Sequence, residues 1–228
     1  MASIGQKSEA VTLTYFHGWG LAEQARWVLA AAGIEFQNVC LDTPEDLKAL
    51  RDQGDLLFGQ LPLLRIDGLR LVQSQAIVRY VAHKVGLSGA TPAEAALVDM
   101  VAEAAKDCRG PVTGFPFASD KAAHLAQLPA TFEKYFPKFE AALATSGSGH
   151  VLASGRLSYA DVFLAELVEE YEVMQPGCSV PFPLLAANHA TVTSLPPMKA
   201  YLASANRFPF PHGDLCTAYV ANIQAVLR

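Results

Sequence analysis

Residues 11–33, VTLTYFHGWGLAEQARWVLAAAG, contain the pattern that decides the fold of this chain. VTLTYF alternates like a β-strand, and LAEQARWVLAAAG after the glycine turn has the apolar spacing of a helix that ends at Gly33. Tyr15 lies at the point where the strand ends. The succession of strand, turn and helix favours an α/β domain that carries a phenol at the end of its first strand.

The segments that follow continue this alternation. We expect a strand in IEFQNVCL, a helix capped by Thr43 in TPEDLKAL, and a hairpin in PLLRIDGLRLVQ that turns at Asp67 and Gly68. The last helix of this half, SQAIVRYVAHKVG, is expected to take Ser74 as its N-cap. The predicted order is therefore βαβαββα, which packs helices on both faces of a small mixed sheet.

The second half has a different pattern. A loop of small residues ends in an expected capping box from Thr91 to Glu94, and beyond it only helical segments separated by Gly, Pro and Ser are found. The sequence predicts an α/β domain over residues 1–86, a linker at 87–91 and an all-α domain over 92–228.

Composition limits the classes of function. The chain has 228 residues, of which 51% are hydrophobic and 17% charged, so it can bury a substantial core. The apolar runs are shorter than the ~20 residues that cross a bilayer, and MASIGQKSEA lacks the apolar region of a secretory signal. We therefore expect a cytoplasmic protein that does not enter a membrane.

The net charge and the spacing of cysteine and histidine argue against a nucleic-acid-binding protein and against a metalloprotein. The net charge of -5 offers no basic surface for nucleic acid. The four cysteines form no C-x-x-C pair, and the six histidines show no metal-binding spacing. We expect no metal site and no nucleic-acid partner.

The order of the elements, with Tyr15 ending the first strand, GQLPLLRIDG at 59–68 and LVQSQAIVRYVA at 71–82, resembles the cytosolic glutathione S-transferases. The similarity covers nearly the whole chain and is greatest to the tyrosine-type classes, alpha and sigma. It implies a thioredoxin-like domain that binds glutathione, followed by a helical domain that contributes the pocket for a hydrophobic electrophile. The implied activity is conjugation of this electrophile to glutathione, which acts as co-substrate. Residues 18–21, 109–117 and 208–219 are expected to form the electrophile pocket.

Tyr15 matches the catalytic tyrosine of that family. The thiol of glutathione has an ordinary pKa near ~8.5, whereas the thiolate is the nucleophile. A hydroxyl that donates a hydrogen bond to sulfur stabilises the charged form and lowers this pKa. A tyrosine suits the role because it stays protonated at neutral pH. The alternative is a half-buried strand aromatic without a chemical role.

Three residues around a proline match the segment that holds the backbone of glutathione. By resemblance, Leu61 offers its main-chain N–H and C=O to the cysteinyl unit, Pro62 follows a cis peptide bond, and Gln60 belongs to the same site. The local alternative for Pro62 is a proline that begins an edge strand.

The two carboxylates of glutathione have expected partners as well. Gln73 and Ser74 stand at a helix N-terminus, where free N–H groups favour the γ-glutamyl carboxylate, although Ser74 is equally suited to a plain N-cap. Arg51 lies where alpha-like members place a basic residue for the glycyl carboxylate, and its alternative is a solvated arginine.

Two further matches imply a homodimer. Phe58 corresponds to the aromatic key that alpha-like subunits insert into their neighbour, and Asp107 to the acid that reaches the glutathione bound by the partner subunit. Ser158 and Asp161 match the capping box of the helical domain, where their role is in folding.

The turn after Tyr15 departs from the family. It usually reads R-G-R, but here it is Trp19-Gly20-Leu21, so both arginines are absent. The loss of a nearby cation removes electrostatic support for the thiolate. Trp19 and Leu21 are expected either to line the electrophile pocket or to pack between the domains. This turn keeps open a non-catalytic relative that binds glutathione or hydrophobic ligands or serves as a structural protein. A glutathione-dependent isomerase or peroxidase is also open, and the sequence does not identify the electrophile.

Overall fold

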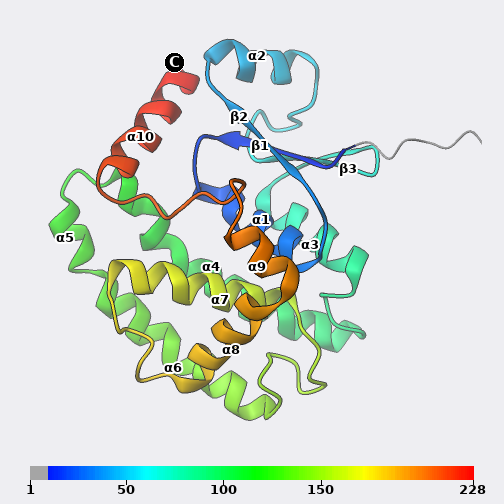
Figure 1. Ribbon diagram of the computed structural model, residues 1–228, viewed down its shortest axis with the longest axis vertical. Coiled ribbons are helices and arrows are strands. Elements are labelled where there is room, and N and C mark those ends of the chain that lie inside the picture. The colour runs from blue at the N-terminus through cyan, green and yellow to red at the C-terminus, as the bar shows by residue number, and fades with distance from the viewer. Residues whose placement is uncertain (1–9) are drawn as a thin grey trace, which may run out of the picture.

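The computed structural model describes residues 10–228, so the segment 1–9, with the expected lack of a secretory signal, lies outside the described residues. The first half contains the predicted βαβαββα order, with one added 3-10 turn (Figure 1). Its elements are β1 (Thr12–Phe16), η1 (Gly20–Ala22), α1 (Glu23–Ala31), β2 (Gln37–Leu41), α2 (Pro44–Asp52), β3 (Leu63–Ile66), β4 (Leu69–Val72) and α3 (Ser74–Val85). The strand order is β2-β1-β3-β4, in which β1 and β2 are parallel and the other neighbours antiparallel. This arrangement confirms the thioredoxin-like class of fold.

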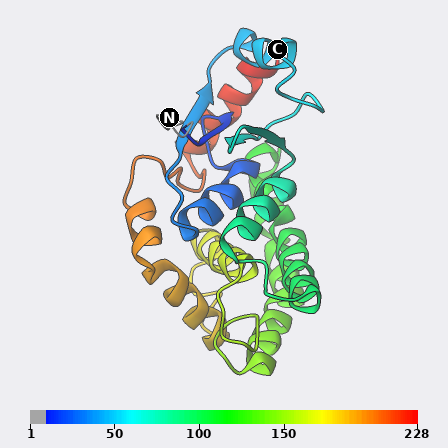
Figure 2. The ribbon, with the colours of Figure 1, turned by 90° about the vertical axis from the view of Figure 1, so that its right-hand side faces the viewer.

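The second half of the described chain is helical, as predicted. Its elements are α4 (Pro92–Gly114), η2 (Phe115–Phe117), α5 (Lys121–Leu125), α6 (Leu128–Ser146), α7 (Tyr159–Met174), α8 (Pro183–Ser194), α9 (Pro196–Leu202) and α10 (Asp214–Leu227). Helix α7 forms the centre, because it is buried along most of its length and packs against α4, α8 and α1. In Figure 2 helices α4 to α9 lie below the sheet, with α8 and α9 on one side and α4 to α6 on the other, whereas α10 lies at the top beside α2.

Local turn chemistry explains most element boundaries. Asp67 and Gly68 both adopt positive φ, 53° and 74°, which is what the tight hairpin between β3 and β4 requires. Thr43 caps α2 through its side chain as predicted. The expected cap of α3 is wrong by one residue: Gln73, at φ 71°, is the N-cap, and Ser74 is the first helical residue.

The two expected capping boxes of the helical half differ. At α4 the Thr91 hydroxyl accepts the Glu94 N–H at 3.2 Å, but the Glu94 carboxylate accepts the N–H of Ala90 at 2.6 Å instead of that of Thr91. The reciprocal half of the box is therefore absent there. At α7 the box between Ser158 and Asp161 is complete.

Asp161 does more than cap a helix. Its side chain is fully buried and accepts hydrogen bonds from the N–H groups of Ser158 and Val151, each at 2.8 Å, from the Ser158 hydroxyl at 2.6 Å, and from the Asn188 amide at 3.0 Å. The Asp161 carboxylate, whose Oδ1 lies 3.6 Å from Nδ1 of His150, raises the pKa of that imidazole, against the opposing effect of its burial. One carboxylate thus joins the start of α7 to the preceding loop and to α8.

The C-terminal helix α10 lies within the predicted all-α half, although the sequence analysis gives no bounds for it. It returns to the first half and lies beside α2 in both views (Figures 1 and 2). Asn222 fixes it there, because its side chain accepts the His17 N–H at 2.8 Å and donates to the Leu41 carbonyl at 3.0 Å. Between residues 10 and 228, none of the helices combines the length and the apolar character needed to span a bilayer.

Candidate active site

A cleft of about 300 Å³ opens where β1, α2 and the start of α3 meet. It is lined by Tyr15, Phe16, Leu21, Leu47, Arg51, Gly59, Gln60, Leu61, Pro62, Gln73, Ser74 and Leu227. The structure therefore brings together every residue that the sequence assigned to glutathione binding within one subunit. They come from four separate segments of the first half, and α10 contributes Leu227.

Tyr15 is one of the residues that line this cleft. Its side chain is only 5% exposed, and its ring packs edge-on against Phe16 with centroids 5.0 Å apart. The hydroxyl oxygen accepts a hydrogen bond from the Leu21 N–H at 3.1 Å. This bond uses a lone pair of the oxygen and not the phenolic proton.

The proline segment has the expected backbone. The Leu61–Pro62 peptide bond is cis. Pro62 precedes β3, which pairs with both β1 and β4, so the alternative of a proline that begins an edge strand is wrong.

The start of α3 and the end of α2 supply polar groups. The Gln73 amide donates to Gln60 at 3.2 Å, so these two side chains meet across the cleft. Ser74 begins α3, a helix of 12 residues whose first N–H groups favour an anion. Arg51 donates to the Gly59 carbonyl through Nε at 3.2 Å and Nη2 at 3.0 Å, which fixes its guanidinium at the rim of the cleft.

Phe58 and Asp107 lie outside the cleft. Phe58 is 62% exposed and its neighbour Leu57 is 78% exposed, so the loop before Gly59 presents two large apolar side chains to solvent. Asp107 is exposed on α4.

The two unusual turn residues lie in different places. Leu21 is 51% exposed and lines the Tyr15 cleft. Trp19 is only 3% exposed, packs edge-on against Phe210 at 5.0 Å between centroids, and lines a separate cavity of about 230 Å³ between α1 and α7. The structure thus places Trp19 outside the Tyr15 cleft, in the packing between the two halves that the sequence left as the alternative.

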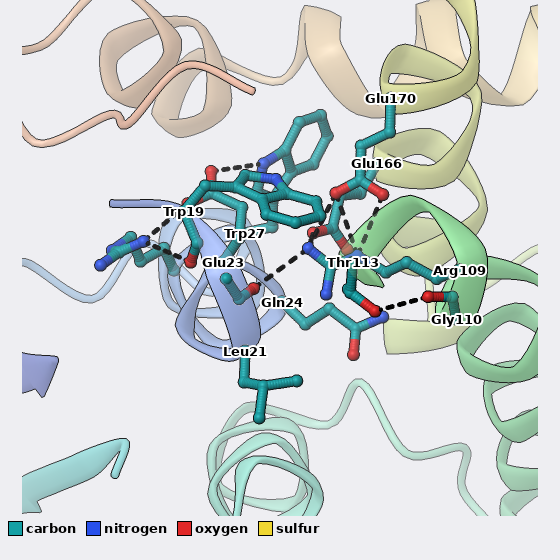
Figure 3. A network of polar contacts seen from close by, with 12 residues as sticks. Trp19, Leu21, Glu23, Gln24, Trp27, Arg109, Gly110, Thr113, Glu166 and Glu170 are labelled. Atoms are coloured by element: carbon teal, nitrogen blue, oxygen red, sulfur yellow. Dashed lines mark hydrogen bonds and ion pairs between the residues drawn. The ribbon is translucent and has the colours of Figure 1, made fainter. Parts of the chain in front are cut away.

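Sequence reasoning missed a buried charged cluster beside this turn, because it placed Arg109 only at the edge of the electrophile pocket. Arg109 of α4 is 3% exposed, pairs with Glu166 and Glu170 of α7, and lies over the Trp19 ring at 4.0 Å from its centroid (Figure 3). Burial raises the pKa of both glutamates, opposed by the charge of Arg109. The available signal was two glutamates four residues apart within the apolar segment of α7.

The closeness of Tyr219 of α10 to Tyr15 was missed as well. Tyr219 closes over the turn so tightly that a Cβ on Gly18 would lie 2.2 Å from Cδ2 of its ring. A Cβ on Gly20, whose φ is +43°, would lie 2.2 Å from the Tyr219 hydroxyl and 2.6 Å from the Tyr15 hydroxyl. Only glycine fits these positions, and the two phenols meet above Gly20. Burial raises the pKa of Tyr219, so it stays protonated.

Comparisons with known proteins agree with this geometry. Residues 11–83 match the family model for the glutathione S-transferase N-terminal domain, and residues 106–205 match that for the C-terminal domain. Glutathione S-transferase A2 of Bos taurus is 42% identical over 83% of this chain and 86% of its own. Glutathione S-transferase 3 of Gallus gallus is 38% identical over 95% of this chain and 94% of its own.

A solved structure of a glutathione S-transferase has the same fold as this chain. The crystal structure of monomeric Na-GST-3, a glutathione S-transferase from the hookworm Necator americanus, superimposes with a TM-score of 0.77 at 32% identity. The match covers 89% of this chain and 100% of the hookworm chain. Together with the two matched domains and the cleft around Tyr15, these similarities show that the chain belongs to the glutathione S-transferase family and is a transferase that uses glutathione.

Proposed function

We propose that Tyr15 activates glutathione by donating its phenolic proton to the sulfur, and that the resulting thiolate attacks an apolar electrophile. The observation that carries this proposal is the place of the Tyr15 hydroxyl, which lines the cleft and accepts the Leu21 N–H through its oxygen, a bond that does not use the phenolic proton. A hydrogen bond to sulfur favours the thiolate, and holding both reactants in one site supplies the rest of the rate enhancement.

The remaining residues of the cleft would hold the tripeptide. Gln73 and Ser74 would bind the γ-glutamyl carboxylate at the start of α3, and Leu61 would pair with the cysteinyl backbone. Arg51 would meet the glycyl carboxylate from the rim, with Gln60 bonded to Gln73 between them. Glutathione would then extend from α3 towards Tyr15, and no metal is required for this chemistry.

The electrophile would enter on the side of Leu21. Exposed Leu21 lies at the cleft, and Tyr219 packs against Phe117, which is 53% exposed, with ring centroids 6.0 Å apart. These side chains favour an apolar substrate, which fits a role in detoxification. Residues 1–86 would bind glutathione, residues 92–228 would contribute the electrophile side, and 87–91 would join them. A cytoplasmic location stays a prediction from the sequence.

Glutathione-dependent turnover of a chromogenic aryl halide by the purified protein tests this function. Conjugation should be accompanied by ultraviolet absorbance of bound thiolate at a pH below the ordinary pKa of the thiol. Glutathione that binds as a thiol, without any turnover of several aryl halides, would instead establish the non-catalytic alternative.

We also propose a homodimer in which Phe58 inserts into the partner subunit and Asp107 reaches the partner's bound glutathione. Phe58→Ser should weaken dimerisation by about 1000-fold or more, because a symmetric interface loses two buried phenyl groups at roughly 2 kcal/mol each. Sedimentation velocity over a dilution series measures this change. Val180→Ser is the matched control, because Val180 is 79% exposed in the helical half. A wild-type protein that sediments as a monomer, like the monomeric hookworm protein Na-GST-3, would contradict the proposal.

A further inference from the structure

We infer that Arg109, from the helical half, is a positioning residue for Tyr15 and replaces from a distance the cation that the turn 19–21 lacks. The inference rests on the proposed role of Tyr15. In this inference Arg109 holds and polarises the peptide group between Gly20 and Leu21, whose N–H binds the Tyr15 hydroxyl.

The connection runs through a single peptide unit. The carbonyl of Gly20 and the N–H of Leu21 belong to the same planar group and point in opposite directions. Arg109 Nη2 donates to that carbonyl at 3.2 Å, and the Leu21 N–H donates to the Tyr15 oxygen at 3.1 Å. A cation on the carbonyl draws electrons towards the oxygen, which makes the N–H a stronger donor. The charge of Arg109 therefore reaches the phenol without direct contact.

Arg109 is itself held in a fixed place. Its Nε lies 3.0 Å from both carboxylate oxygens of Glu170, and its Nη2 lies 2.8 Å from Oε1 of the same residue. The indole of Trp19 covers its guanidinium at 4.0 Å. Because arginine, glutamate and indole are all buried, this charge is not screened by solvent as a surface arginine would be.

The replacement of arginine by tryptophan in the turn is consistent with this arrangement. An arginine at position 19 would bring a second guanidinium against Arg109, whereas the flat face of an indole stabilises the cation that is already present. The positive charge of Arg109 and the Tyr15 hydroxyl that it supports thus come from different halves of the molecule.

Arg26 provides a matched comparison. It is fully buried, and its Nη1 donates to the Trp19 carbonyl at 3.1 Å and to Glu23 at 2.8 Å. Its target is the peptide between residues 19 and 20, whose N–H is that of Gly20. Arg26 therefore supports the same turn without binding the peptide that contacts Tyr15.

The experiment compares two charge-neutralised variants. Arg109→Met with Glu166→Gln and Glu170→Gln removes the cation and both of its partner carboxylates together, so no unpaired charge is buried. Arg26→Met with Glu23→Gln does the same at the neighbouring peptide. The readouts are the pKa of bound glutathione, from thiolate absorbance across pH, and kcat/KM for a chromogenic aryl halide. Circular dichroism confirms that each protein is folded.

We expect the Arg109 variant to raise the pKa of the bound thiol and to lower kcat/KM by about five-fold, the effect of losing roughly one ordinary hydrogen bond. The KM for glutathione should not change, because Arg109 does not line the cleft. The Arg26 variant should lose thermal stability but keep the thiol pKa of the wild type. Equal shifts in the pKa of bound glutathione in both variants would mean that Arg109 only supports the fold, and they would overturn the inference.

Tyr15→Phe in both backgrounds separates this inference from the proposed function. If Arg109 acts through Tyr15, its removal should have no further effect on the thiol pKa once the hydroxyl is gone. A Tyr15→Phe variant with a normal thiol pKa disproves the proposed function itself. A Tyr15→Phe variant with a raised pKa, combined with an Arg109 variant at the wild-type pKa, disproves the inference alone. Arg109→Gln with Glu166→Gln and Glu170→Gln, which keeps polar side chains at the same positions without the cation, provides the same test if the methionine variant does not fold.

Discussion

Tyr15→Phe should lower kcat/KM for glutathione-dependent conjugation by about 10- to 100-fold, the effect of removing a hydrogen bond to a charged group. The phenyl ring keeps the packing against Phe16, so the fold should not change. The loss should lie mainly in kcat at neutral pH and shrink at high pH, where solution hydroxide ionises the thiol without help from the enzyme. The pH profile of kcat/KM, followed with an aryl halide, measures both effects.

Two further tyrosines make this test specific. Tyr80 donates its hydroxyl to Asp67 at 2.7 Å outside the cleft, so Tyr80→Phe removes a hydroxyl of the same kind and should leave kcat/KM unchanged. Tyr219→Phe removes the second phenolic hydroxyl above Gly20 and tests whether this hydroxyl also contributes to kcat/KM. Full activity of Tyr15→Phe at neutral pH, with Tyr219 intact or replaced, contradicts the proposed mechanism.

Asp161→Ala should lower the free energy of unfolding by about 3–5 kcal/mol, which corresponds to a fall in Tm of roughly 10 °C for a chain of this size. The alanine leaves the N–H groups of Val151 and Ser158 and the amide of Asn188 without their acceptor in the interior. Each orphaned buried donor costs about 1–3 kcal/mol, and the effects of neighbours are not fully additive. Denaturant unfolding followed by circular dichroism measures the loss.

The chain contains its own control for this prediction. Asp46 forms the same kind of capping box with Thr43 at the start of α2, but in an exposed position. Asp46→Ala should therefore cost only about 1 kcal/mol, as an ordinary cap does. Similar losses in the two variants would mean that the buried contacts of Asp161 add nothing to its role as a cap.

The features that were predicted correctly from the sequence are those that depend on neighbouring residues in the chain. The order of strands and helices follows from apolar spacing, and the hairpin follows from an Asp-Gly pair that tolerates positive φ. The residues around Tyr15 were predicted together because the resemblance to glutathione S-transferases assigns them to one site, and the structure brings them into one cleft. The Thr91 box was wrong because the Glu94 carboxylate has another donor within reach, the N–H of Ala90.

Contacts between distant segments could not be predicted in the same way. Arg109 and Gly20 are 89 residues apart, and an arginine on a helix gives no local sign of whether solvent or a buried glutamate surrounds it. Trp19 lies away from the cleft and packs against that same arginine. The start of α10 was not predicted because it lies in the segment 208–219, which was assigned to the pocket, although Asp214 in its first turn is a usual start signal.

Trp19 and Trp27 are the only tryptophans of the chain, and both are buried where α1 faces α7, at 3% and 2% exposure. Intrinsic fluorescence therefore observes the contact between the two halves, whereas far-ultraviolet circular dichroism is dominated by the helices of the second half. If unfolding is followed by both signals, a fluorescence change that precedes the loss of circular dichroism indicates that the halves separate before the helices unfold. This measurement needs no added label. Trp19 is thus also an intrinsic optical probe of the contact between the two halves.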